Sequence, residues 1–466
     1  MTDMPWQGDV VSLVDAFRAG ERSPVEEVEA TLAAIDRSDL NAVCHVDPEA
    51  ALAAAAVADT ALPFGGVAIG VKELDRVEGW PDTHASVPFA DDIATYTDTK
   101  IDRLTDAGGV LVAQTTSSEF GGVNQTYTKL HGATRNPWNP DRTPGGSSGG
   151  SAAGVAGGLF PVATGGDGGG SIRIPAGFTG LFGLKSTFGR ISRGPHVGPG
   201  NLTVVAGCLS RSVRDTARWF DVSNGFDARD PLTLPRVEGW EDGLGSFAED
   251  LTGRPAAVIP EFAGAVVADE TQALVIEAAE WLIEAAGLAR RTPEVPLPRT
   301  GGAWSVTGAV GLWQTVKDKW PDCAPDLTGP MRAGVEASLE HFDVTAAARA
   351  EEARIELNQG MAALFDEVDF VFTATNPDVA FQAAGRLPST FGGREAPAIN
   401  NGALTIPSNI YGNPAVSIPV GTSSDGLPVG LQVLAPHHHE QLLLDLALLV
   451  ERERPWPLVA PGASTA

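Results

Sequence analysis

The chain has 466 residues, 43% of them hydrophobic, so it is long enough to bury one large core or two ordinary ones. Asp and Glu total 59 against 32 for Lys and Arg, and the formal charge of −27 argues against a nucleic acid or an anionic membrane as a partner. Three cysteines without a CxxC pair favour a reducing compartment over a disulfide framework or a zinc site. The N-terminus lacks an apolar signal segment and no apolar run reaches about 18 residues, so we expect a cytoplasmic protein.

Helix and strand patterns alternate along the first third of the chain. Ser23, Pro24 and Glu26 form a capping-box start for a helix that we expect to run to about Ile35. Residues 49–60 are rich in alanine and predict a second helix. The apolar run 67–71 then predicts a buried strand that ends at Lys72, and a helix over 102–108 and a strand over 110–113 follow. This alternation is typical of α/β proteins.

The middle of the chain holds two glycine-serine loops, 144–151 and 165–171, which bracket a predicted helix over 152–159 and a predicted strand over 160–164. Later we predict a strand over 256–259, a helix over 270–286, a helix from about 346 and a strand over 368–372. We expect one domain over 1–466 built on one sheet, with a helical N-terminal segment over about 1–60. The tail from Pro455 is expected to be loose.

Dense glycine in the two loops is compatible with phosphate binding, an oxyanion hole or tight turns. A Walker loop needs a Gly-Lys pair, which the chain lacks, and the dinucleotide pattern fails because Ser171 stands where a third glycine belongs. The nucleophile-elbow pattern matches at Ser147 and Ser148, but the preceding segment 136–140 is polar and broken by prolines. An α/β-hydrolase is therefore disfavoured.

Both loops together resemble the signature of the amidase signature family. The first is GGSSGGS at 145–151 and the second is DGGGSIRIP at 167–175, and their serines 147 and 171 are 24 residues apart, the interval that the family keeps. The resemblance extends to GVKEL at 70–74, HGATRNPW at 131–138, GLK at 183–185 and the segments 413–419 and 427–433. It implies the family's α/β fold, a large mixed, twisted β-sheet covered by helices on both faces.

The resemblance also implies roles for three side chains. Ser171 is expected to be the nucleophile, Ser147, in a cis peptide, to relay its proton, and Lys72 to be the base. A serine needs such a base at neutral pH, and Ser-Lys versions of this arrangement exist. Burial would help Lys72 to lose its charge, whereas Glu73 and Asp75 would oppose this if they point inward.

The backbone amides of the second loop are implied to form the oxyanion hole, with tight turns as the alternative; the three glycines concerned are Gly168, Gly169 and Gly170. Asp167 and Arg173 are expected to hold this loop by hydrogen bonds. The segment 296–342 has weak periodicity and several tryptophans, which fit either core packing or the wall of a pocket, and we treat it as a substrate-pocket insertion. Substrate-binding candidates are Gly121, Gly122, Trp304 and Trp313.

These roles predict an amidohydrolase that cleaves a small-molecule carboxylic amide through a Ser171 acyl-enzyme, without a metal or an organic cofactor. The kind of amide and a homodimeric assembly are left open. One alternative is the glutaminase (A) subunit of a tRNA-dependent amidotransferase, although residues 333–358 lack the LGTY-type segment of those proteins. A non-catalytic binding member of the family and a glycine-rich nucleotide-binding protein are the others.

Overall fold

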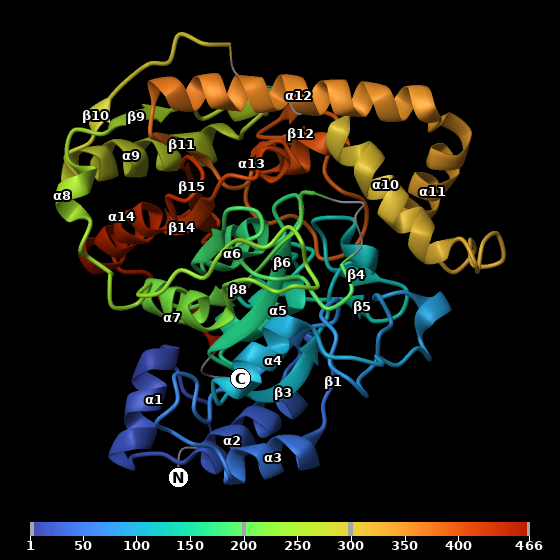
Figure 1. Ribbon diagram of the computed structural model, residues 1–466, viewed down its shortest axis with the longest axis vertical. Coiled ribbons are helices and arrows are strands. Elements are labelled where there is room, and N and C mark those ends of the chain that lie inside the picture. Colours follow the sequence, from blue (N-terminus) through green and yellow to red (C-terminus); the bar gives the residue numbers. More distant parts are fainter. Residues whose placement is uncertain (1–3, 198–201, 297–301, 464–466) are drawn as a thin grey trace.

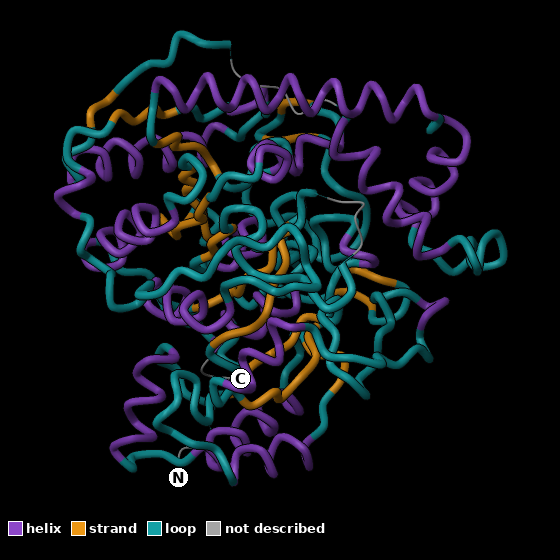
Figure 2. Tube along the Cα trace, in the orientation of Figure 1, coloured by secondary structure: helices purple, strands orange, loops and turns teal. Residues whose placement is uncertain are grey.

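The computed structural model describes residues 4–197, 202–296 and 302–463 (Figures 1 and 2). Its helices are α1 (Val10–Ala19), α2 (Pro24–Arg37), α3 (Pro48–Ala56), α4 (Thr99–Asp106), α5 (Gly149–Ala156), α6 (Arg173–Thr179), α7 (Val213–Ser223), α8 (Ala248–Leu251), α9 (Asp269–Ala285), α10 (Ala303–Val316), α11 (Gly329–His341), α12 (Val344–Glu367), α13 (Ile406–Tyr411) and α14 (Glu440–Glu453).

Two mixed sheets form the centre of the described structure. The first has the order β1 (Val43–His45), β3 (Val110–Thr115), β2 (Ala68–Lys72), β6 (Val162–Asp167) and β8 (Val205–Ser210). The second has the order β10 (Ala289–Arg290), β9 (Pro255–Val258), β11 (Phe370–Ala374), β15 (Pro428–Leu434), β14 (Ala415–Thr422) and β7 (Gly183–Lys185). Two small hairpins pair β4 (Tyr127–Thr128) with β5 (Gly132–Ala133) and β12 (Thr390–Phe391) with β13 (Arg394–Glu395).

The two large sheets meet at one place. Among the described residues, one bridge pairs Phe182, immediately before β7, with Ser210, the last residue of β8. The bridge joins the edge strand β8 of the first sheet to β7 of the second, and the predicted α/β fold with a large mixed β-sheet core is confirmed, with that core divided between these two sheets. Every residue of β2, β8, β11 and β15 is buried, because helices and loops cover both faces of these strands.

The helices lie at both ends of the molecule as well as on the sheets. Figure 1 shows α1, α2 and α3 at one end and the long α12, with α10 and α11, at the other. The start of α2 is as predicted: Ser23 and Glu26 form a complete capping box, with Pro24 in the first turn. Parallel strands β2, β3 and β6 end at one edge of their sheet, so Lys72, Thr115 and Asp167 are brought to the same side.

The C-terminal segment differs from its prediction as a loose tail. Trp456 and Ala460 are buried, and the indole Nε1 of Trp456 donates a hydrogen bond to the carbonyl oxygen of Arg211 (3.0 Å). Ala460 N donates to Ala156 O at the end of α5 (2.7 Å). An apolar indole and these backbone bonds hold the segment as far as residue 463, and the last three residues of the predicted tail lie outside the described residues.

Candidate active site

Lys72 lies at the end of β2 and is buried beneath the first glycine-serine loop. Its Nζ donates hydrogen bonds to Ser147 Oγ (2.7 Å) and Ser148 Oγ (2.9 Å). The peptide bond between Gly146 and Ser147 is cis, as the family resemblance implied. Both serines are buried, so the lysine amine and the two hydroxyls form a polar cluster shielded from bulk water. The structure thus brings Lys72 and Ser147 together.

Burial dominates the electrostatics of Lys72. Removal from water disfavours the cation and lowers the pKa of Lys72 from 10.5 to about 8, while Asp75, Asp167 and Glu73 act in the opposite direction. The side chain is therefore not a solvated surface charge. A lysine with a pKa of about 8 is neutral in roughly a tenth of the molecules at pH 7, and in that form it is able to accept a proton.

The second loop is held by a buried ion pair between Asp167 and Arg173. Arg173 Nε and Nη2 donate to the Asp167 carboxylate at 2.9 Å each, and both side chains are fully buried. Although burial opposes it, the Arg173 guanidinium together with hydrogen bonds from Arg173 and Asn409 holds the pKa of Asp167 well below its usual range. These contacts agree with the predicted loop-holding role. They fix the turn on which Ser171 lies.

Ser171 is half-buried and faces a cavity of about 760 Å³ that Lys72 and Ser147 also line. Within the described part of the chain, its hydroxyl makes no hydrogen bond, so the structure places it in the same cavity as Ser147 without bonding the two side chains. Catalytic hydrogen bonds are often absent from unliganded sites and form only with bound substrate.

The three glycines before Ser171 differ in what their backbone groups contact. Gly170 has φ of +122° and its N–H donates to Asp167 Oδ1 (2.7 Å), so this amide is engaged in the turn itself. The carbonyl of Gly168 accepts from Trp304 Nε1 and that of Gly169 from Thr405 Oγ1, both at 2.7 Å. In the described residues, the N–H groups of Gly168 and Gly169 make no hydrogen bond. Of the three glycines predicted to supply oxyanion donors, Gly168 and Gly169 are thus the two whose N–H groups are not engaged within the described structure.

The cavity has walls of different character. Its apolar wall is formed by α10, α11 and the segment 387–399, and consists mainly of Trp304, Leu312, Met331, Phe342, Leu387 and Ile399. Its charged wall includes Asp75, Arg76, Asp98, Lys100, Arg193 and His196. The predicted insertion at 296–342 therefore contributes helices to the apolar wall, apart from residues 297–301, which lie outside the described residues.

The four predicted substrate-binding residues have different positions. Gly121, Gly122 and Trp304 line the cavity, and a Cβ on Gly121 would lie 3.4 Å from Ser147 Oγ. Trp313 does not line it and instead packs in a small hydrophobic cluster with Val316 and Cys323. The reason is helical geometry, because Trp304 and Trp313 are nine residues apart in α10 and so point to opposite faces. The structure corrects Trp313 to a packing residue.

Comparisons with known proteins agree with this geometry. The Amidase family profile matches residues 26–444. The chain belongs to the amidase signature family. It is 31% identical to the A subunit of glutamyl-tRNA(Gln) amidotransferase from Chloroflexus aggregans, with 97% of each chain covered. It is 30% identical to an acylamidase of Rhodococcus erythropolis, with 95% of this chain and 94% of the relative covered.

Solved structures of amidase signature enzymes superpose closely on this family member. A bacterial aryl acylamidase matches with a TM-score of 0.88 and 26% identity, with 97% of each chain covered. A 6-aminohexanoate cyclic dimer hydrolase matches with a TM-score of 0.88 and 29% identity over 98% of this chain and 99% of the other. The protein is thus an enzyme of the amide-hydrolysing type. No described helix has the length and apolar composition needed to cross a membrane.

The amidase site contains residues that sequence reasoning did not select. Ser148 bonds Lys72 as Ser147 does, and Thr405 reaches Gly169 from a segment 236 residues away. Lys100 lies in the charged wall and forms ion pairs with Asp75 and Asp98. Ser148 was marked in the sequence only by its place next to Ser147 in the first glycine-serine loop and by the weak elbow pattern, whereas Thr405 and Lys100 come from segments with no distinctive motif.

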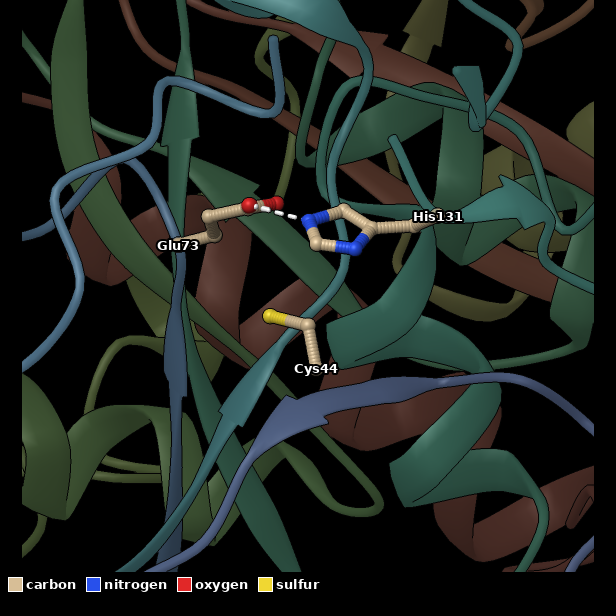
Figure 3. Close-up of side chains that lie close together, drawn as sticks. All are labelled: Cys44, Glu73 and His131. Carbon is tan, nitrogen blue, oxygen red and sulfur yellow. Dashed lines mark hydrogen bonds and ion pairs between the residues drawn. The ribbon is translucent and has the colours of Figure 1, made fainter. Parts of the chain in front are cut away.

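A second cluster lies beside the amidase site and involves Glu73, the residue after Lys72. Figure 3 shows the Glu73 carboxylate pointing to His131, with the Cys44 thiol nearby. Glu73 Oε1 bonds His131 Nε2 (2.6 Å) and Thr83 Oγ1, while Ser117 N donates to Oε2 (3.3 Å). Burial raises the pKa of the Cys44 thiol well above its usual range, which favours its neutral form. Both Glu73 oxygens are thus occupied by groups other than Lys72.

Proposed function

We propose that this chain is a free-standing amidohydrolase that cleaves a carboxylic amide through an acyl-enzyme at Ser171. The observation that supports this most directly is the 2.7 Å hydrogen bond from Lys72 Nζ to Ser147 Oγ, in a cavity that Ser171 also lines. In the proposed mechanism, Ser171 Oγ attacks the amide carbonyl. Its proton passes to Ser147 Oγ, whose own proton passes to the neutral amine of Lys72.

The second half of the reaction reverses this proton transfer. As the C–N bond breaks, Ser147 gives a proton to the leaving nitrogen and regains one from the Lys72 ammonium. Water then attacks the acyl-enzyme, losing a proton along the same path, and releases the carboxylic acid and Ser171. The amides of Gly168 and Gly169 are the proposed donors to the oxyanion of both tetrahedral intermediates.

The substrate that we propose carries an apolar group next to the amide. The apolar wall supports this, because Leu312, Met331 and Phe342 would exclude water from such a group. A test is a hydrolysis screen of the purified chain over anilides, aliphatic amides and glutamine, with Ser171→Ala alongside. Faster cleavage of apolar amides than of glutamine is expected. Glutamine cleavage alone, and only with an amidotransferase partner added, would instead support the role of a glutaminase subunit, which the Chloroflexus relative suggests.

Trp304 is proposed to orient the oxyanion loop. Its indole N–H holds Gly168 O, and because N–H and C=O point in opposite directions across a trans peptide, this bond also orients the N–H of Gly169. We expect Trp304→Phe to lower kcat about fivefold, since one hydrogen bond is worth about 1 kcal/mol, with a smaller change in KM. Steady-state kinetics would measure the two constants. Trp313→Phe, on the opposite face of α10, is the matched control and should leave kcat unchanged; equal losses in both variants would contradict the proposed role.

Two glycines of α10 are proposed to set the size of the accepted group. Gly308 and Gly311 line the cavity, and a Cβ at either would meet nothing within 4 Å. Neither has a positive φ, and glycine inside a helix costs about 1 kcal/mol relative to alanine, so neither backbone conformation nor packing requires them. What they provide is space in the cavity.

We therefore expect Gly308→Leu to lower kcat/KM at least about tenfold for a bulky apolar amide while leaving a short aliphatic amide within about threefold. The measurement is kcat/KM of the wild type and of Gly308→Leu on each of these two amides. Val310→Leu is the control, because Val310 is 54% exposed on the same helix. Equal loss for both amides would indicate a general distortion of α10 and not a limit on substrate size.

A further inference from the structure

Three carboxylates surround Lys72, and each has its own partner. Asp75, Asp167 and Glu73 favour the cationic form of Lys72, whereas Lys100 disfavours it. Asp167 is paired with Arg173. Glu73 is bonded to His131 (Figure 3) and also to Thr83. The third carboxylate is Asp75. Of the charged groups around Lys72, Asp75 has the largest effect on the pKa of Lys72, second only to the effect of burial itself.

Asp75 is tied to Lys72 through the backbone and through one threonine. Asp75 N donates to Lys72 O (2.7 Å), and Thr164 Oγ1 donates to Asp75 Oδ2 (2.5 Å) while accepting from Lys72 N (2.7 Å). These contacts keep the carboxylate close to the lysine. A buried anion at this position would favour the charged, non-basic form of Lys72.

Lys100 neutralises this anion. From the first turn of α4, its Nζ lies 2.9 Å from Asp75 Oδ1 and 2.9 Å from Asp98 Oδ2. All three side chains are buried and line the same cavity as Lys72. Although burial opposes it, the two carboxylates raise the pKa of Lys100 above its ordinary value, so Lys100 stays charged while Lys72 loses its proton more readily.

We propose that Lys100 is a positioning residue of this site, which by pairing with Asp75 prevents that carboxylate from holding Lys72 in its charged form. The proposal rests on the proposed role of Lys72 as base. It gives two buried lysines of one cavity opposite tasks: Lys100 is permanently cationic, and Lys72 is able to become neutral. A purely structural ion pair would affect stability without changing the pH at which the site becomes active.

The test is the rate at which an alkyl fluorophosphonate inactivates the enzyme, measured from pH 6 to 10. In this reaction Ser171 Oγ bonds to phosphorus, the P–F bond breaks, fluoride leaves and the hydroxyl proton passes towards Ser147 and Lys72. The rate therefore follows the neutral fraction of Lys72 without requiring the natural substrate. The midpoint of this pH dependence is the pH at which the inactivation rate is half of its maximum. We expect Lys100→Met to move this midpoint upward by about one pH unit or more, with about a tenfold lower inactivation rate at pH 7.

Matched variants separate charge from structure. Lys100→Arg keeps the cation and should keep the wild-type midpoint, whereas Asp75→Asn removes the anion and should move the midpoint downward. The double variant Asp75→Asn/Lys100→Met removes one charge of each sign and should return the midpoint close to the wild-type value. If Lys100→Met fails to fold because two buried carboxylates lose their partner, Asp75→Asn and the double variant still show whether the charge of Asp75 sets the pH midpoint of inactivation.

Wild-type midpoints in Asp75→Asn and in any folded Lys100→Met would overturn the proposal, as would a double variant that keeps the upward shift. Failure of the proposed function has a different signature. If Ser171→Ala were labelled by the fluorophosphonate as fast as the wild type, the nucleophile assignment itself would be wrong, whatever the midpoints of the Lys100 variants.

Discussion

Replacing Ser171 by alanine is expected to lower kcat by a factor on the order of 10⁴ to 10⁶, because the proposed acyl-enzyme cannot form without its hydroxyl. Residual activity would come from substrate binding and the oxyanion donors alone. The fold should be unaffected, since the Ser171 hydroxyl makes no hydrogen bond within the described residues and the side chain is half-buried. Turnover of the best amide from the screen, together with the thermal midpoint, measures both effects.

A matched control for this variant is available in the same cavity. Ser305, on α10, also lines the cavity and is exposed. Ser305→Ala should keep kcat within about threefold of the wild type, because its hydroxyl is assigned no part in the chemistry. Retention of full activity by Ser171→Ala would show that another group is the nucleophile.

Replacing Lys72 by methionine is expected to lower kcat about 10²- to 10⁴-fold, the range associated with loss of a general base. Its effect on stability should be unusual for a buried position. The pKa of Lys72 is about 8 in the folded protein and 10.5 as its ordinary value, so between these pH values the unfolded chain binds more protons. The free energy of unfolding of the wild type therefore rises with pH between these two values. At pH values below this window, where Lys72 is charged in both states, burying the cation disfavours folding by about 3 kcal/mol.

Methionine has a similar length and no charge, so Lys72→Met removes that penalty while losing the hydrogen bonds to Ser147 and Ser148. We expect a thermal midpoint at pH 7 that is no lower than the wild type's, and a smaller rise in stability between pH 8 and pH 10. Lys129→Met, at an exposed lysine, is the control and should change neither activity nor this pH dependence. Unfolding of Lys72→Met at neutral pH would indicate a structural lysine instead.

Local features of the chain were predictable to a useful extent. The capping box at Ser23 and Glu26 needs only residues within one turn, and the strand ending at Lys72 follows from a short apolar run. By contrast, α10 was not predicted. It contains no charged residue and two interior glycines, because one face lines the cavity and the opposite face packs in a hydrophobic cluster, so the usual alternation of polar and apolar residues is missing.

The sequence by itself determined the family, the two glycine-serine loops and the three side chains proposed for the chemistry, because these depend on short motifs and a constant spacing. Only the tertiary structure decided which partner each carboxylate near Lys72 takes, since Arg173, His131 and Lys100 come from separate segments. It also decided that Trp304 contacts the second glycine-serine loop and Trp313 does not. Partners and exposure depend on how distant segments pack, and the charge state of the buried lysine follows from that packing.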